Sequence, residues 1–236
     1  AIHMEKRELI DVVESFRYRV KAVACYRKLY QEYCNAYPKY HEAINVCPAF
    51  WTFTIRAYLH SMMIDLCKLY DADKKVYGVF HLLDVCKQNI SLFAEPKLLD
   101  GERYATEAEA REFFQSFDDT VGGTEITNSF LDNLEVECNN RSEKIDNLRL
   151  QRNKLWAHND CKHFLNPSEY EMEKLLTWTD IDDLIGLLVD ISNTLLRHLG
   201  KGSTGILPAN IDDIQIIIEA VKMKENRDGQ IENALC

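Results

Sequence analysis

The sequence predicts an all-α protein built as a bundle of helices. Apolar residues recur every three to four positions along most of the 236-residue chain, which is the period of an amphipathic helix. No stretch alternates apolar and polar residues for long enough to form a sheet. With 46% hydrophobic residues, the chain can bury one substantial core and is too apolar to be disordered. We therefore expect one main helical domain with additional helices.

Two long helices are expected in the first third of the chain. The periodic pattern over residues 5–35 predicts an amphipathic helix that ends before Pro38. Pro48 suits the first turn of a second helix, which should stop near Asp71. The buried face of this second helix is predicted from the apolar positions Phe50, Phe53, Ala57, Ile64, Cys67 and Tyr70.

The rest of the chain predicts six further helical segments. The first three are residues 77–90, a short helix capped by Thr106, and a mostly charged stretch over residues 125–160 with a bend near Asn139-Asn140. The others are a segment capped by Ser168, a central packing helix capped by Thr179 and apolar through Leu199, and a last helix that is capped by Asn210 and frays after Lys224.

Breaks in this pattern divide the chain. Residues 1–3 precede Met4 and are expected to be a tag remnant, with Met4 as the native start. We expect a helical domain over residues 4–200, a glycine-rich connector over 201–209, and a C-terminal helix and tail over 210–236. Residues 200–205, where the connector begins, spell G-x-G-x-x-G, but a helix precedes them and Pro208 follows. A dinucleotide fingerprint instead needs a strand before it and a helix opening within it.

Composition excludes several classes of protein. A net charge of −10 argues against a surface that coats nucleic acid non-specifically, so any RNA contact must be local. The eight cysteines stand singly, without a CxxC pair, which favours reduced and mostly buried thiols over a disulfide scaffold. No signal peptide follows Met4, and acidic residues interrupt the most apolar stretch, residues 181–199. We expect a cytoplasmic protein without membrane contact.

Residues 152–158 combine a cation, an amide and an imidazole within two helical turns. His158 can take or give a proton near neutral pH, as cleavage of RNA by its own 2′-hydroxyl requires. Arg152 can stabilise the charge that develops on the phosphorus. Asn153 can bind the phosphate or orient the arginine, and Asp160 can support the histidine or the helix end. These residue types indicate phosphodiester cleavage.

Charge and helical geometry refine this hypothesis. Residues 141–163 hold six Lys/Arg against three Asp/Glu, and this local excess makes Lys154 and Arg149 RNA-binding candidates. Positions 152 and 158 differ by about 120° around a regular helix, so one continuous helix would not aim both at one phosphate. A second subunit that supplies its own copy of the motif solves this most simply. We therefore expect a composite site across a homodimer.

Two other interpretations of this segment compete with an active site. Residue types alone favour a solvated helix face, with Leu155 and Trp156 in the core and His158 at the helix end. His158, Cys161 and His163 resemble zinc ligands, but a structural zinc site needs a fourth ligand, and none stands nearby. We expect no metal and no other cofactor.

The run over residues 150–160 resembles the defining motif of HEPN domains: an arginine, a polar residue, a few others, then a histidine. The segments Phe50-Trp51 and Leu66-Cys67-Lys68-Leu69-Tyr70-Asp71 are similar to the early core helix of the abortive-infection branch of this superfamily. The likeness covers residues 5–200. It implies a dimerising helical bundle that acts as a metal-independent endoribonuclease in toxicity or phage defence. Arg152 and His158 would be catalytic, with Asn153 as their polar companion.

The resemblance leaves two points open. Some HEPN proteins are catalytically silent modules that bind RNA or a partner protein, so a silent dimer is the alternative function. Some HEPN toxins carry a tyrosine two residues after the histidine as a modification target for an antitoxin. Asp160 stands at that position here, which puts this mode of control in doubt. An antitoxin or regulatory protein remains a candidate partner beside the RNA.

Overall fold

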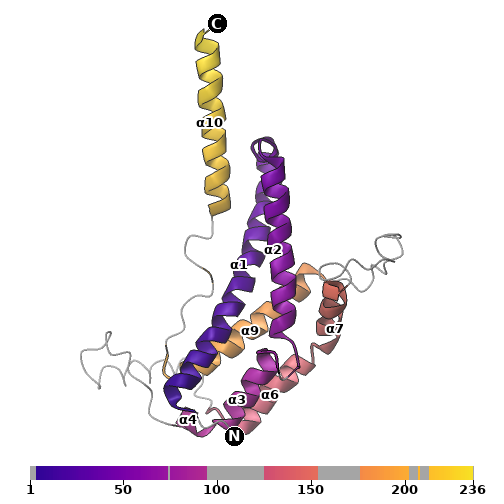
Figure 1. The fold of residues 1–236 in the computed structure, drawn as a ribbon, viewed down its shortest axis with the longest axis vertical. Helices are drawn as coiled ribbons and strands as arrows, with labels where there is room; N and C mark the ends of the chain where they lie inside the picture. The colour runs from indigo at the N-terminus through magenta and orange to yellow at the C-terminus, as the bar shows by residue number, and fades with distance from the viewer. Residues whose placement is uncertain are drawn as a thin grey trace, which may run out of the picture. The chain divides into compact units, whose positions relative to one another are not determined.

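The computed structural model describes residues 4–73, 75–94, 125–153, 176–201, 207 and 213–235 (Figure 1). Helices are the regular elements of these residues, and none of the described residues forms a strand. The predicted all-α class is therefore confirmed. The described helices are α1 (Lys6–Asn45), α2 (Pro48–Leu69), α3 (Val79–Gln88), α4 (Ser91–Ala94), α6 (Asn128–Asn139), α7 (Ser142–Gln151), α9 (Trp178–His198) and α10 (Asp213–Leu235). The helices predicted at Thr106 and Ser168 lie outside the described residues.

The chain forms two compact units. Unit 1 comprises Ala1–Val20 and Leu66–Thr204, and unit 2 comprises Lys21–Asp65 and Gly205–Cys236. Helices α1 and α2 run through both units, whereas α3, α4, α6, α7 and α9 belong to unit 1 and α10 to unit 2. The boundaries predicted around the glycine-rich connector stay a prediction.

Helix α1 passes through Pro38, whereas its sequence predicted an end before this residue. Proline in a helix interior removes one backbone hydrogen bond and costs about 3 kcal/mol. The backbone leaves helical geometry locally at Tyr40, with φ −128° and ψ 25°. Ala43 and Ile44 then bury their side chains in the core of unit 2, with Ile218 of α10 among their neighbours. This burial explains why the segment resumes its helix after the kink.

The buried face of α2 differs from the predicted one. Phe50 and Phe53 are 55% and 69% exposed, and Ala57 is exposed as well. Cys67 and Tyr70 are buried as predicted, while Ile64 is half-buried. The apolar residues of α2 are distributed around the whole helix, so their spacing alone does not identify the buried face. The core face is formed instead by Trp51, Ile55, Met62, Met63 and Leu66.

Helix α9 is the central packing helix that its periodicity predicted. Its N-cap is Thr177 rather than Thr179. The Thr177 hydroxyl accepts a hydrogen bond from the backbone N–H of Asp180, and the Asp180 carboxylate accepts one from the backbone N–H of Thr177. Both Thr177-x-x-Asp180 and Thr179-x-x-Asp182 fit a capping box, so the sequence pattern does not choose between them. The buried side chains of α9 are Ile181, Leu184, Ile185, Leu188, Ile191, Ser192, Leu195 and Leu196.

Two further boundaries test the predictions. The charged stretch that begins near residue 125 is two helices, α6 and α7, with the break at Asn140 and Arg141, which agrees with the expected bend. Its predicted extension to residue 160 lies outside the described residues. Helix α10 continues past Lys224 to Leu235, and the fraying expected after Lys224 stays a prediction. Within the described part of the chain, no helix is long and apolar enough to cross a bilayer.

Candidate functional site

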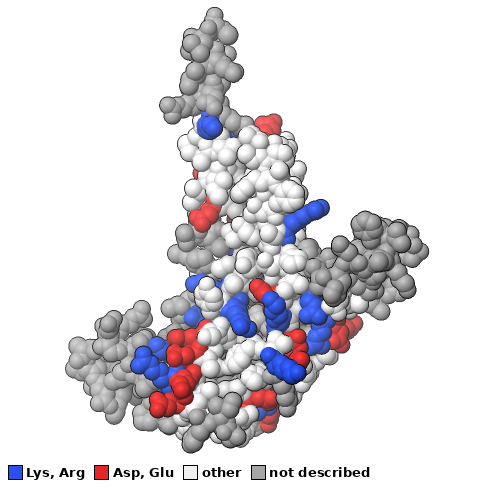
Figure 2. Space-filling view, viewed as in Figure 1, with Lys and Arg blue, Asp and Glu red and all other residues white. Residues whose placement is uncertain are grey.

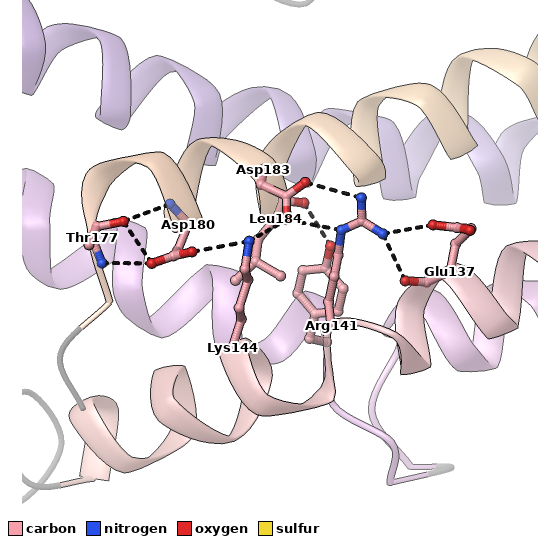
Figure 3. A network of polar contacts seen from close by, with 8 residues as sticks. Glu137, Arg141, Lys144, Thr177, Asp180, Asp183 and Leu184 are labelled. Carbon is pink, nitrogen blue, oxygen red and sulfur yellow. Dashed lines mark hydrogen bonds and ion pairs between the residues drawn. The ribbon is translucent and has the colours of Figure 1, made fainter. Parts of the chain in front are cut away.

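Helix α7 carries the first residues of the predicted site, and an ionic network fixes its N-terminal end to α9 (Figure 3). Arg141 donates from Nε and Nη2 to the two carboxylate oxygens of Asp183, at 3.0 and 3.1 Å, and from Nη1 to Glu137 at 2.9 Å. Lys144 donates to Asp183 at 2.9 Å and pairs with Asp180 at 3.0 Å. The hydrogen bonds from Arg141 hold the pKa of Asp183 below its usual range. The network therefore sets the direction of α7.

The C-terminal half of α7 is held by the end of α2. The Cys67 thiol donates to the carbonyl of Leu148 at 3.5 Å, and Arg149 Nη2 donates to the carbonyl of Tyr70 at 2.9 Å. Tyr70 in turn donates its hydroxyl to the carbonyl of Leu184 in α9, at 2.7 Å. Burial raises the pKa of Cys67 to about 11, although the nearby arginines oppose the shift. The thiol therefore stays protonated at neutral pH and acts as a packing group.

Arg152 and Asn153 lie in a π-type turn that follows α7, and their side chains contact each other. The guanidinium donates from Nε and Nη2 to Asn153 Oδ1, at 3.0 and 2.8 Å. Two of its five N–H groups are used in this contact, and none pairs with a carboxylate in the described part of the chain. Asn153 is exposed and Arg152 half-buried. Among the described residues, Asn153 thus orients the guanidinium, and the other N–H groups of Arg152 are left as donors for an anion.

Arg149, an RNA-binding candidate, is more strongly engaged than the sequence suggested. Besides its bond to the Tyr70 carbonyl, it donates from Nη1 to Asp146 at 3.0 Å. Arg149 thus serves first to join α7 to the end of α2.

Gln151 is a residue of this helix that no sequence motif pointed to. It is buried, and its Nε2 has no hydrogen-bond acceptor among the described residues. Its only sequence signal was an amide between an apolar residue and the motif arginine.

The remaining predicted residues lie outside the described part of the chain. These are His158, Lys154 and Asp160, together with the zinc alternatives Cys161 and His163. The structure thus brings Arg149, Arg152 and Asn153 to one end of α7 and leaves their relation to the histidine as a prediction. Among the described residues, no cluster of three His, Cys, Asp or Glu side chains is placed to hold a metal ion.

A cavity of about 350 Å³ opens beside Arg149, between α3, α6 and α7. No sequence pattern indicated it, because its walls come from segments separated by up to 77 positions. Phe80 and Asp84 of α3 form one side, and Glu135 and Asn139 of α6 form another. Arg149 contributes to the wall from α7.

Surface charge agrees with a local binding site. On the face shown in Figure 2, the Lys and Arg side chains stand among Asp and Glu side chains. The described part of this face therefore has no continuous basic surface of the kind that binds nucleic acid broadly. An RNA strand would have to be recognised at a few specific groups.

A helical bundle that holds an arginine and its polar companion at the end of a core helix is the arrangement of a HEPN domain. Residues 6–216 match the family model HEPN_AbiU2, described as AbiU2. Because this match spans most of the chain, the protein belongs to the AbiU2 family, the branch of HEPN proteins linked to abortive infection. Membership implies a role in phage defence by abortive infection. No curated protein and no solved structure matches the chain.

Proposed function

We propose that this protein is a metal-independent endoribonuclease that cuts RNA as the effector of abortive infection. The observation that carries the proposal is the contact between Arg152 and Asn153, which orients a guanidinium while leaving N–H groups for a phosphate. HEPN proteins are typically ribonucleases, and the chain carries both the arginine and the histidine of their motif.

In the proposed reaction, the ribose 2′-oxygen attacks the adjacent phosphorus, and the bond to the 5′-oxygen of the next nucleotide breaks. His158 accepts the 2′-hydroxyl proton or donates a proton to the leaving oxygen. Arg152 stabilises the extra negative charge on the phosphorane. The products are a 2′,3′-cyclic phosphate and a free 5′-hydroxyl. Asn153 holds the arginine, and Lys154 and Asp160 support phosphate binding and the histidine, respectively.

We further propose that two copies of the chain form one composite site. The argument is the angle of about 120° between positions 152 and 158 on a regular helix, which separates their side chains. A two-fold axis beside the motif would place His158 of one copy near Arg152 of the other. This arrangement also supplies two histidines, one to accept and one to donate a proton.

The test is cleavage of a single-stranded RNA by purified protein in the presence of EDTA. We expect cleavage in wild type and at least a 100-fold loss in Arg152→Ala and in His158→Ala, as for removal of a charge-stabilising or proton-transfer group. Arg7→Ala on the exposed face of α1 is the matched control and should cut like wild type. Because a contaminating nuclease would survive both substitutions, equal cleavage by the variants would refute the proposal.

Two finer variants test how Asn153 acts. Arg152→Lys keeps the charge but removes the pair of N–H groups that contact Asn153, and Asn153→Ala removes their acceptor. If Asn153 orients the arginine, both variants should lower the cleavage rate while RNA binding falls less. RNA that binds in an Arg152-dependent manner but stays intact would instead favour the catalytically silent HEPN dimer.

A further inference from the structure

The cavity between α3, α6 and α7 lies next to the proposed cleavage site. Arg149 lines it and stands three residues before Arg152. Three residues of helix advance by about 4.5 Å along the axis and about 60° around it. A nucleotide whose phosphate contacts Arg152 therefore has its own base, or that of its neighbour, within reach of this cavity.

The polar groups on the cavity wall differ in how far they are already engaged. Glu135 pairs with Lys87, and Asp146 pairs with Arg149. The carboxylate of Asp84 forms no ion pair or hydrogen bond with another described residue, although it is only half-exposed. It is therefore an acceptor available to a ligand, in a wall with three acidic side chains against one arginine.

The acidic groups of the cavity wall determine which part of an RNA chain can bind there. A phosphate would meet three carboxylates and is disfavoured. A base has no charge, and it can pack on the half-buried ring of Phe80 while its N–H groups reach Asp84. The cavity volume lies at the lower end of the range for ligand pockets, which suits one nucleoside.

Among the four bases, guanine fits this wall best. Its N1–H and N2–H groups are adjacent and point the same way, so that a carboxylate accepts from both. Adenine and cytosine each place an acceptor nitrogen beside their amino group, and uracil flanks its N–H with two carbonyls, so each would turn an acceptor toward Asp84. The guanine O6 also offers an acceptor to His81 or Asn139, which line the same cavity.

We propose that this cavity is a base-recognition subsite that takes a guanine next to the cleaved phosphate, with Asp84 as its specificity-determining residue. The inference rests on the proposed ribonuclease function for its biological meaning. Recognition of the free nucleoside is nevertheless measurable without any cleavage.

The first experiment titrates the full-length protein with guanosine and, separately, with cytidine, by isothermal calorimetry. We expect saturable guanosine binding that Asp84→Asn weakens about tenfold or more, since the amide cannot accept from both N–H groups. Asp190→Asn, on the exposed face of α9, is the matched control and should bind like wild type. Guanosine binding no tighter than that of cytidine, or unchanged in Asp84→Asn, would overturn the proposal.

The second experiment maps the ends of RNA fragments produced by wild type and Asp84→Asn. We expect wild type to cut beside guanosine and the variant to lose that preference while still cutting. A preference that survives in the variant would contradict the inference and leave the nuclease proposal intact. If neither protein cuts, the nuclease proposal fails and the titration alone decides the subsite. Should Asp84→Asn unfold, Ser142→Trp fills the cavity from an exposed position and should abolish guanosine binding.

Discussion

Two tyrosines of unit 1 with buried hydroxyl groups provide a matched test of the structure. Tyr70 is fully buried, and its hydroxyl donates to the Leu184 carbonyl at 2.7 Å. The Tyr77 hydroxyl is also buried but has no hydrogen-bond partner among the described residues, and burial raises its pKa to about 12. Replacing each with phenylalanine keeps the ring and removes one hydroxyl. The two substitutions should therefore have different effects on stability.

The magnitudes follow from the partners that remain. Tyr70→Phe loses one buried hydrogen bond, but Leu184 lies inside α9 and its carbonyl keeps its helical bond. The cost should be about 1 kcal/mol, below the 1–3 kcal/mol expected for a buried acceptor left without any partner. Tyr77→Phe removes a desolvated hydroxyl that gains nothing in return, so it should be neutral or stabilising by up to about 1 kcal/mol.

Thermal unfolding followed by circular dichroism measures both changes. A cost of 1 kcal/mol in a protein of this size corresponds to a fall of about 2–4 °C in the thermal midpoint, well within the precision of the method. If Tyr77→Phe destabilises the protein as much as Tyr70→Phe, the Tyr77 hydroxyl has a partner and the described packing around it is wrong. If Tyr70→Phe is neutral, the bond between α2 and α9 does not contribute to stability.

The start of α9 and its ionic contacts give two further predictions. Thr177→Ala should cost about 1 kcal/mol in urea unfolding because it removes the N-cap, whereas Thr179→Ala should stay within about 0.5 kcal/mol. The pKa of Asp183 is lowered, first by its hydrogen bonds from Arg141 and then by those from Lys144, so its contribution to stability is present above the ordinary value of 3.8 and is lost as pH falls below it. The stability difference between wild type and Asp183→Asn should therefore shrink between neutral pH and pH 3; a constant difference would show that the ion pair is not responsible.

Local sequence signals predicted those parts of the fold that one helix determines by itself. The apolar period of α9 and the break near Asn140 depend on residues a few positions apart, so the sequence contains them fully. Helix α1 continues past Pro38 because Ala43 and Ile44 pack on distant residues of unit 2, which outweighs the cost of the proline. Helix propensities describe only the local chain and do not include such long-range packing.

The candidate site shows the same division. The types and order of Arg152 and Asn153 could be read from the sequence, and so could a role for the amide in orienting the arginine. The cavity beside them could not, because Asp84 of α3, Glu135 of α6 and Arg149 of α7 meet only after three separate helices have packed. Arg149 appeared as a free basic group in the sequence, yet folding commits two of its N–H groups to other atoms. A sequence motif can therefore predict the reacting groups of a site, but not the surrounding residues that give the site its specificity.

The segment Leu66-Cys67-Lys68-Leu69-Tyr70-Asp71 contacts the helix that leads into the run over residues 150–160, so these two segments of the family resemblance are linked through α7. Cys67 and Tyr70, at the end of α2, hold Leu148 and Arg149 of α7 through one thiol and one carbonyl contact. Arg152 begins the next turn after these residues, so its position depends on bonds that no catalytic substitution would touch. Cys67→Ala, which removes the thiol contact with Leu148, should then lower the cleavage rate with little effect on RNA affinity, because orientation of the cation matters more in the transition state than in binding. This dependence supplies a physical reason for the two segments to occur together: the second places the arginine, and the first holds the helix that carries it.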